Sequence, residues 1–589
     1  MAPAESIETE VLVVGAGPAG GTAGLLLATY GIDNIILNKY AGVAPTPRAH
    51  ITNQRTMEVM RDLGLERHVA SIATPRSLMG EHIWGTSLVG DELARMMTWH
   101  SHPLSNAEHD LASPCSTCDI PQTELEPILV NTAAARGSAV RTMTEYISHI
   151  DDGDGVTTRA VDRMTGSEIT IRSKYLVGAD GGRSTVAENI GLELVGFEGL
   201  GTSVGVYFRA DLSEYVAHRP GDMYWMIQPG FGMGGLGIGV LRMVRAWDLW
   251  IATSGFDPAE DEPEYTSDLA RGIVHKVVGK EIDFELLDIS PWVINAIYAE
   301  DSVKGRVICI GDAVHRHSPM YGLGSNTSIG DAYNLAWKLA MVIRGQAGPG
   351  LVMTYQDERI PVGTQLVEMA TMGIMMLHPL FEALGLDGPV DEETMSRALA
   401  ELRAPTPEGS QMRDAFREAV ATALPGFNSL GVGLNQRYSS DAVMAEDDAA
   451  DDPDIDMNLH FVASSRPGAH LPHVWLVGPD QQRMSTLDLC GQGAFTVLTG
   501  ASGTAGWRDA CASARKSLGT DIRLKVIGPE GDAADAYGDY ARMSEVTESG
   551  ALLVRPDMFI GWRTPDVSTA GELEGVLRRV LHRDLHPKE

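Results

Sequence analysis

The chain has 589 residues, 44% of them hydrophobic, and its 46 Lys and Arg against 79 Asp and Glu give a formal net charge of −33 at pH 7. This length suggests roughly three or four domains, and the negative charge argues against nucleic acid or an anionic membrane surface as a partner. Because no basic region precedes the first apolar stretch, and the uncharged stretch 369–381 is too short to cross a bilayer, we expect a cytoplasmic protein without a membrane span.

The first predicted element is a buried strand that leads into a glycine-rich turn. Residues 11–14 are apolar and mostly β-branched, and Gly15, Gly17 and Gly20 follow as a GxGxxG motif. Such glycines allow a tight turn, close approach of a pyrophosphate and packing of the next helix, whose N-terminus stabilises phosphate charge. With a second strand at 34–37, the pattern predicts dinucleotide binding, and a glycine-rich turn without a ligand is the alternative.

The second strand ends at Asn38 and Lys39, where a carboxylate usually binds the ribose hydroxyls. An amide can still accept a hydrogen bond from ribose, although without the strength that a charge adds. We therefore assign Asn38 and Lys39 to the nucleotide site.

The chain contains five cysteines, which do not indicate a disulfide framework. They are Cys115, Cys118, Cys309, Cys490 and Cys511. Cys115 and Cys118 have the spacing of a redox dithiol, but a zinc site would need a second pair. We expect no metal site and ordinary buried or loop thiols, with a catalytic dithiol as the alternative.

Two further predicted strands are each followed by a turn that contains an aspartate. The strand at 175–178 leads to Asp180, and the strand at 305–311 leads to Asp312, which is placed to bind the hydroxyls of a ribityl chain. Gly322 and Gly324 then let backbone pass close to a flat ring.

A helix capped by Asn326 or Thr327 follows this loop. Its N-terminus, aimed at the pyrimidine edge of an isoalloxazine ring, would stabilise negative charge on reduced flavin. This second motif narrows the predicted dinucleotide to a flavin.

The remaining segments differ in composition. Residues 190–290 are rich in β-branched, aromatic and glycine residues, with 223–226 and 234–242 as examples, and predict an antiparallel sheet that binds substrate. Residues 350–430 read as helical, and 441–456 form an acidic, solvated linker. From 466 onward strands alternate with helices, as in a small thioredoxin-like unit, whose isolated Cys490 and Cys511 predict a redox-inactive domain.

The predicted fold is α/β: a Rossmann-like FAD-binding domain, an inserted, mainly antiparallel substrate domain and a C-terminal thioredoxin-like domain. The boundaries are 1–77, 110–189 and 295–400 for the FAD-binding domain, 78–109 and 190–294 for the substrate domain, 401–465 for a helical and acidic linker, and 466–589 for the thioredoxin-like domain.

Several longer motifs resemble one family over nearly the whole chain. They are residues 47–58, 118–122, 218–220, 224–225, 242–245, 311–315, 322–326, 334–338 and 435–438. With them the chain resembles the class A flavin-dependent aromatic hydroxylases, the group of para-hydroxybenzoate and phenol hydroxylases. It is most similar in pattern to the branch of 2,4-dichlorophenol 6-monooxygenase and 2-hydroxybiphenyl 3-monooxygenase. Departures from the wider family are Ser318 before a single proline, Tyr321 at the expected flavin face, and Ala187 in place of an arginine.

The resemblance implies that NADH or NADPH, bound without a Rossmann domain of its own, reduces FAD, and that O₂ then forms a C4a-hydroperoxyflavin that hydroxylates a phenol-like ring. A free phenol has a pKa of about 10, so a base that removes its proton should speed the transfer. His50 and Asp119 match the branch's substrate-activating pair and are the candidate catalytic residues; a structural hydrogen-bonding role is the alternative for each.

The other predicted site residues fall into two groups. The cofactor site takes Gly15, Gly17, Gly20, Asn38, Lys39, Arg48, Gln122, Asp180, Asp312, Gly322, Gly324, Ser325 and Asn326. The substrate pocket takes Tyr224, Trp225, Met226, Arg242, Pro319 and Tyr321, with core packing as the alternative for the first three and surface salt bridging for Arg242.

The substrate could belong to pollutant catabolism or to the tailoring of a polyketide phenol or hydroxypyridine. A flavin reductase or oxidase that works without an aromatic substrate is the alternative enzyme, and a flavin-binding module without turnover is the non-enzymatic alternative. We also expect a homo-oligomer.

Overall fold

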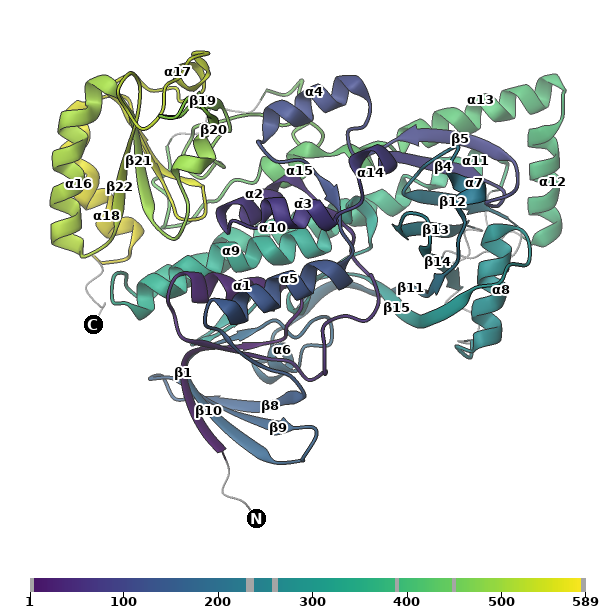
Figure 1. Cartoon of the computed structure of the whole chain (residues 1–589), viewed down its shortest axis with the longest axis horizontal. Helices are drawn as coiled ribbons and strands as arrows, with labels where there is room; N and C mark the ends of the chain where they lie inside the picture. The colour runs from purple at the N-terminus through teal and green to yellow at the C-terminus, as the bar shows by residue number, and fades with distance from the viewer. Residues whose placement is uncertain (1–4, 229–237, 257–262, 387–390, 447–451, 584–589) are drawn as a thin grey trace.

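The computed structural model describes residues 5–228, 238–256, 263–386, 391–446 and 452–583, and its helices and strands form a mixed α/β architecture around two large sheets (Figure 1). Figure 1 shows the mainly parallel sheet at the bottom, the second sheet at the right and a C-terminal unit, residues 466–583, at the upper left. The acidic residues 447–451 of the predicted linker lie outside the described residues.

The first sheet carries the dinucleotide motif. Its strands are β1 (Glu5–Val14), β2 (Asn34–Leu37), β7 (Ala139–Arg141), β8 (Thr144–Asp151), β9 (Val156–Asp162), β10 (Glu168–Gly178), β16 (Val303–Lys304) and β17 (Val307–Cys309). They lie in the order β16-β17-β10-β1-β2-β7, with β8 and β9 joined to β10, and β1 pairs in parallel with both β2 and β10. The predicted strand at 34–37 is confirmed.

Three helices cover this sheet. Helix α1 (Pro18–Thr29) begins directly after Gly17, with a proline in its first turn where no N–H is needed. It packs against both α5 (Gln122–Ala135) and α9 (Gly324–Ile343). Both glycine-rich motifs therefore start helices that pack side by side.

The second sheet is almost entirely antiparallel. Its strands are β4 (Glu81–Gly85), β5 (Glu92–Met97), β11 (Leu194–Arg209), β12 (Met223–Ile227), β13 (Ile238–Arg245), β14 (Leu249–Phe256), β15 (Glu285–Ala299) and β18 (His315–Arg316), in the order β18-β15-β11-β14-β13-β12-β4-β5. The predicted strand at 223–226 is confirmed, whereas residues 234–237 of the strand predicted at 234–242 lie outside the described residues. Helix α8 (Ser267–Val278) packs on one face of this sheet.

A short two-stranded ladder lies between the two large sheets. In it β3 (Ile51–Thr52) pairs with β6 (Cys118–Asp119). The remaining helices before the C-terminal unit are α2 (Gln54–Asp62), α3 (Glu66–Ile72), α4 (Pro103–Ala112), α6 (Thr185–Asn189), α7 (Ser213–Val216), α10 (Gly350–Met375), α11 (His378–Ala383), α12 (Glu392–Arg403), α13 (Pro407–Thr422), α14 (Pro425–Asn428) and α15 (Leu430–Leu434). The helical prediction for 350–430 is thus confirmed for the described residues.

The C-terminal unit has a four-stranded sheet in the order β22-β21-β23-β24 and a separate hairpin of β19 and β20. Its elements are β19 (Trp475–Val477), β20 (Arg483–Ser485), β21 (Phe495–Gly500), α16 (Thr504–Leu518), β22 (Ile522–Ile527), α17 (Asp539–Met543), β23 (Ala551–Val554), β24 (Ile560–Thr564) and α18 (Leu573–Val580). In this unit Phe495 packs edge-on against Trp337 of α9, at a ring distance of 5.7 Å.

One described stretch, Gly350–Ala383, is long and apolar enough to cross a membrane by length and composition, which differs from the expectation drawn from 369–381. Glu358 and Arg359 lie in this stretch and are buried, and each forms ion pairs with other parts of the fold. Charged side chains that are buried and paired with oppositely charged groups inside the protein are typical of a core helix.

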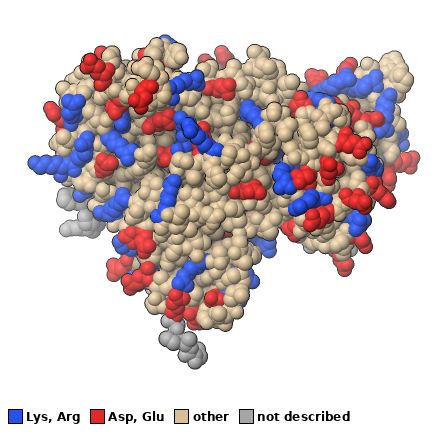
Figure 2. Space-filling model, in the orientation of Figure 1, with Lys and Arg blue, Asp and Glu red and all other residues tan. Residues whose placement is uncertain are grey.

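Acidic and basic side chains intermingle over the face of the molecule that Figure 2 shows. On that face, the net charge of −33 is not gathered into a single acidic patch.

Glu58 in α2 is a buried carboxylate that ties this helix to the C-terminal unit. Its Oε2 accepts a hydrogen bond from Arg55 at 2.9 Å and lies 3.1 Å from His470 Nε2, while Oε1 accepts one from Ser113. Although burial alone raises the pKa of this carboxyl, these partners hold it at about 2.

We predict that Glu58→Gln flattens the acid dependence of stability. Because the folded-state pKa lies below the ordinary value of 4.5, the ionised group stabilises the fold above that value, and this contribution is lost as the pH falls toward about 2. The contribution is on the order of 3 kcal/mol. Urea unfolding over this pH range measures it, with exposed Glu418→Gln as the control. Equal pH slopes for wild type and Glu58→Gln would contradict the prediction.

Candidate active site

The turn after β17 is held by a buried carboxylate from α9. Asp331 Oδ2 accepts a hydrogen bond from the backbone N–H of Gly311 at 3.0 Å and lies 2.9 Å from His315 Nε2. Its Oδ1 accepts one from Arg359 at 2.7 Å. Burial alone raises the pKa of Asp331, but Arg359 and His315 together hold it below its ordinary value. This charge network fixes the turn and leaves the next residue, Asp312, exposed.

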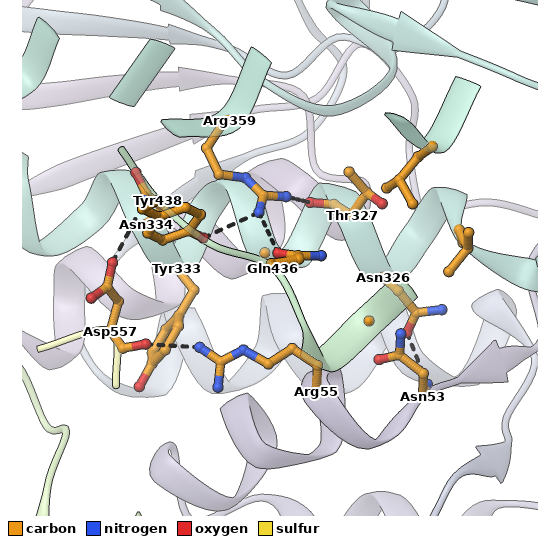
Figure 3. Close-up of a pocket in the computed structure, with 14 residues that line it drawn as sticks. Asn53, Arg55, Asn326, Thr327, Tyr333, Asn334, Arg359, Gln436, Tyr438 and Asp557 are labelled. Carbon is orange, nitrogen blue, oxygen red and sulfur yellow. Dashed lines mark hydrogen bonds between the residues drawn. The ribbon is translucent and has the colours of Figure 1, made fainter. Parts of the chain in front are cut away.

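Asn326 ties the second glycine loop to β3, the strand that directly follows His50. Its Oδ1 accepts a hydrogen bond from the backbone N–H of Asn53 at 3.0 Å (Figure 3). Its amide nitrogen donates to the carbonyl oxygens of Ile51 at 2.9 Å and Gly322 at 2.6 Å. Gly322 has φ +62°, a conformation that favours glycine. The predicted flavin loop is therefore braced against β3.

The dinucleotide turn has the shape that the GxGxxG motif requires. Gly15 has φ +111°, and a Cβ built on it would lie 2.1 Å from the carbonyl oxygen of Ala179. At Gly17 a Cβ would meet a single atom within 4 Å, Oε1 of Glu126, at an ordinary contact distance of 3.7 Å. A tightly packed Gly15 and an uncrowded Gly17 at a helix N-terminus fit a dinucleotide pyrophosphate.

Two predicted nucleotide residues are already engaged within the protein. The Asn38 amide donates to Gly42 O at 2.8 Å and accepts from the backbone N–H of Tyr40, which closes its own turn. Asp180 accepts from the backbone N–H of Val186 and from the hydroxyl of Ser184, near the start of α6. The sequence did not reveal these local roles.

Other predicted cofactor residues lie around the loop 40–50. Gln122, at the start of α5, accepts a hydrogen bond from the backbone N–H of Ala49 and donates one to Glu126. Arg48 is exposed, and Lys39 and Ser325 are partly buried.

The structure brings the two predicted catalytic residues together. Nδ1 of His50 lies 3.2 Å from Oδ1 of Asp119, and NH2 of Arg242 donates to Oδ2 of the same carboxylate at 3.0 Å. The Asp119 side chain has no exposed surface. Burial lowers the pKa of His50, and the charge of Arg242 lowers it further against the opposing effect of Asp119. The buried Nε2 of His50 has no hydrogen-bond partner among the described residues.

A second buried carboxylate, which the sequence did not reveal, continues this network. Asp222 lies 3.8 Å from Arg242, accepts a hydrogen bond from Trp99 Nε1 at 3.0 Å and lies 3.5 Å from His82 Nε2. Burial alone raises the pKa of Asp222, yet His82, Arg242 and Trp99 keep it below its ordinary value. Trp225 in turn donates from Nε1 to His82 at 3.3 Å. No motif links these residues, because they come from separate segments of the chain: β4, the turn after β5, the residue before β12, and β13.

The three consecutive residues 224–226 do not share one side of β12, contrary to our expectation for the substrate pocket. Trp225 packs near Trp84 and His82, on the side of the polar network. Tyr224 and Met226 belong to the cluster under α8. The reason is that side chains alternate between the faces of a strand.

A pocket with several aromatic residues in its lining lies next to the flavin loop. Trp99, Tyr321, Leu323 and Phe427 are among the residues that line it. Tyr321 is buried and has φ +65°, which is unusual for a bulky side chain, whereas Pro319 is exposed. Phe427 comes from the segment that we predicted as linker.

The spaced pair Cys115 and Cys118 is buried. Burial raises the pKa of both thiols, that of Cys118 to about 12. A thiolate is the form that redox chemistry requires, so this setting disfavours a catalytic dithiol.

Comparisons with known proteins agree with this geometry. The FAD binding domain family matches residues 8–370, and the aromatic-ring hydroxylase C-terminal family matches residues 464–583. The chain is 49% identical over 580 residues to a 2,4-dichlorophenol 6-monooxygenase of Delftia acidovorans, with 98% of each chain covered. It is 43% identical to a phenol 2-monooxygenase of Pseudomonas sp. (strain EST1001), with 95% of this chain and 90% of the relative covered.

A solved structure of the flavin-dependent monooxygenase PieE in complex with FAD and substrate superposes with a TM-score of 0.92 at 39% identity, covering 98% of this chain and 100% of that one. The chain therefore belongs to the FAD-dependent aromatic-ring hydroxylases. It is a flavin-dependent aromatic monooxygenase with FAD as cofactor and NADH or NADPH as co-substrate, and hydroxylation of a phenol-like ring fits this membership. These relatives do not favour a reductase or oxidase that works without an aromatic substrate.

We predict that Asp312→Asn weakens FAD binding without unfolding the protein. Asp312 is exposed at the end of β17, so removing its charge costs little stability, whereas a ribityl hydroxyl would lose a charge-assisted hydrogen bond. The dissociation constant of FAD, measured by flavin fluorescence, is expected to rise about tenfold. Exposed Asp301→Asn is the control. An unchanged dissociation constant in Asp312→Asn would remove this residue from the site.

Proposed function

We propose that His50 acts as the general base that takes the proton of the substrate's phenolic hydroxyl. One observation supports this role above the others: Nδ1 of His50 faces Asp119, while the buried Nε2 is left without a partner. A carboxylate next to Nδ1 favours the tautomer with its proton on that nitrogen, which leaves a lone pair on Nε2. Removal of the phenolic proton makes the ring more nucleophilic, which ring hydroxylation requires.

Asp119 and Arg242 have supporting roles in this proposal. Asp119 orients the imidazole ring and stabilises the cation that forms when Nε2 accepts a proton. Arg242 donates a hydrogen bond to Asp119 and so compensates the charge of this fully buried carboxylate. When bound, FAD supplies the electrons from the nicotinamide and activates O₂; Gly15, Gly17, Asp312 and the loop braced by Asn326 would hold it.

The substrate in this proposal is a phenol whose ring lies in the cavity lined by Trp99, Tyr321 and Phe427. Relatives named for dichlorophenol and phenol support a single-ring phenol and a catabolic role. A polyketide phenol remains the second candidate because a relative named aklavinone 12-hydroxylase RdmE, from Streptomyces purpurascens, is 34% identical over 98% of this chain.

We also propose the domain roles predicted from the sequence. The FAD-binding domain comprises 1–77, 110–189 and 295–400, and the sheet formed largely by 78–109 and 190–294 is an inserted substrate domain. Residues 401–465 connect the FAD-binding segment 295–400 to a thioredoxin-like unit at 466–589. Buried Cys490 and Cys511, whose thiol pKa values are raised by burial, support a redox-inactive unit.

The proposal further includes a cytoplasmic homo-oligomer that binds neither nucleic acid nor membrane. The net charge of −33 supports the absence of nucleic-acid binding. The buried ion pairs of α10 support the absence of membrane binding.

We predict that Asp119→Asn slows hydroxylation by about 100-fold or more while FAD stays bound. The amide cannot stabilise protonated His50, and general-base contributions of this size are typical. Single-turnover product formation by reduced enzyme with O₂ and phenol measures the effect. Asp110→Asn is the matched control, because Oδ1 of this exposed carboxylate also lies 3.2 Å from a histidine Nδ1, that of His109. Full activity in Asp119→Asn would refute its role.

The function itself is tested by anaerobic stopped-flow reduction of the holoenzyme by NADH and by NADPH, with and without a panel of phenols and hydroxypyridines. We expect one class of aromatic to accelerate flavin reduction and to be recovered as a hydroxylated product when O₂ is admitted. Reduction that no aromatic changes, with H₂O₂ as the only oxygen product, would favour the reductase alternative.

A further inference from the structure

Four charged side chains are buried where the C-terminal unit meets the flavin helix α9. They are Lys338, Glu358, Arg555 and Asp557, and none of these side chains is more than 1% exposed. Lys and Arg are almost never buried this completely unless they are paired. Two positive and two negative groups make the cluster neutral.

Glu358 of α10 is the centre of this cluster. Its Oε2 accepts a hydrogen bond from Lys338 Nζ at 2.7 Å, and the guanidinium of Arg555 donates to both of its oxygens at 2.6 and 2.8 Å. Arg555 also donates to both oxygens of Asp557, at 3.0 and 2.6 Å. Burial alone raises the pKa of Glu358, but Arg555 and Lys338 hold it well below its ordinary value.

The cluster reaches α9 on the helix that begins at the flavin loop. Asn334 of α9 donates to Glu358 at 2.7 Å and to Asp557 at 3.3 Å. Arg555 also lies over the ring of Trp337, 5.2 Å from its centroid. The C-terminal unit thus contacts α9 two to four turns after Gly324. The contacting groups are buried, so water cannot take the place of a lost hydrogen-bond partner.

A second line of contacts runs along a small pocket to the flavin loop itself (Figure 3). Arg55 of α2 donates to the carbonyl oxygen of Asp557 at 2.7 Å, and Asn53, at the start of the same helix, donates its backbone N–H to Asn326. Both lines therefore connect Asp557 or its neighbour Arg555 with the helix that starts at Gly324.

We propose that Arg555 and Asp557 are positioning residues by which the C-terminal unit fixes the flavin helix and so retains FAD. This role goes beyond general-base catalysis and does not depend on it. A buried, bidentate charge pair tolerates little displacement, because any shift leaves a charge without solvent or partner. Residues outside the FAD-binding domain therefore fix the position of α9, and with it the position of the loop that Asn326 braces.

The test is the rate at which the holoenzyme loses FAD after dilution, followed by the recovery of free-flavin fluorescence. Arg555→Met leaves both Glu358 and Asp557 short of a partner, and we expect FAD release at least tenfold faster than in wild type. Arg555→Lys keeps the charge but not the bidentate geometry, so its rate of FAD release should lie between those of wild type and Arg555→Met. Asp557→Asn, an isosteric change, is the second variant should Arg555→Met fail to fold, with the same expectation.

Two controls separate positioning from a general loss of stability. Arg563→Met removes a guanidinium of the same unit that pairs with Glu446 and Glu545, away from α9. Leu476→Ala creates a cavity in a separate apolar cluster of the same unit, which contains no residue of α9 and none of the four charged side chains. All rates are measured well below the melting temperature of each variant.

Faster FAD release in the cluster variants, with wild-type rates in both controls and a shifted visible flavin spectrum, supports the proposal. A wild-type release rate in Arg555→Met or Asp557→Asn, whatever the melting temperature, would overturn it. Equal acceleration in Leu476→Ala would overturn it as well, since the effect would then be one of stability alone.

Discussion

The proposed active site depends on one fully buried carboxylate, that of Asp119. A buried charge is tolerated only when it is paired and hydrogen-bonded, so Asp119 requires both Arg242 and His50 as neighbours. Asp119 lies in β6, Arg242 in β13, and His50 directly before β3. The pairing therefore joins the second large sheet to the ladder of β3 and β6, and Nε2 of His50 has no hydrogen-bond partner among the described residues.

Local patterns in the sequence predicted the parts of the fold that depend on local chemistry. The buried strands, the glycine turns and the helices that follow them are encoded within short windows, and His50 and Asp119 stand in recognisable motifs. Asp222, His82 and Trp99 could not be predicted in the same way, because only the pairing of β4, β12 and β13 in one sheet brings these separate segments to Arg242. Assigning all of 224–226 to the pocket ignored the alternation of side chains along a strand.

The same contrast holds for the contacts between the C-terminal unit and the flavin helix. In the sequence Arg555 and Lys338 look like ordinary surface charges, and only the fold shows that neither is exposed. Their burial places the C-terminal unit in contact with the helix whose start forms the flavin loop. Family membership explains why the unit is present, and the buried charges explain what it contacts.

The most direct test of the proposed chemistry is the pH dependence of single-turnover hydroxylation in wild type and in His50→Gln. Burial and Arg242 lower the pKa of His50 below 6.5, so only acidic conditions protonate Nε2 and block proton transfer. The wild-type rate should therefore fall as the pH drops through a pKa below 6.5, and the slower His50→Gln variant should lack this acid limb. The same acid limb in both proteins would contradict a catalytic role for His50.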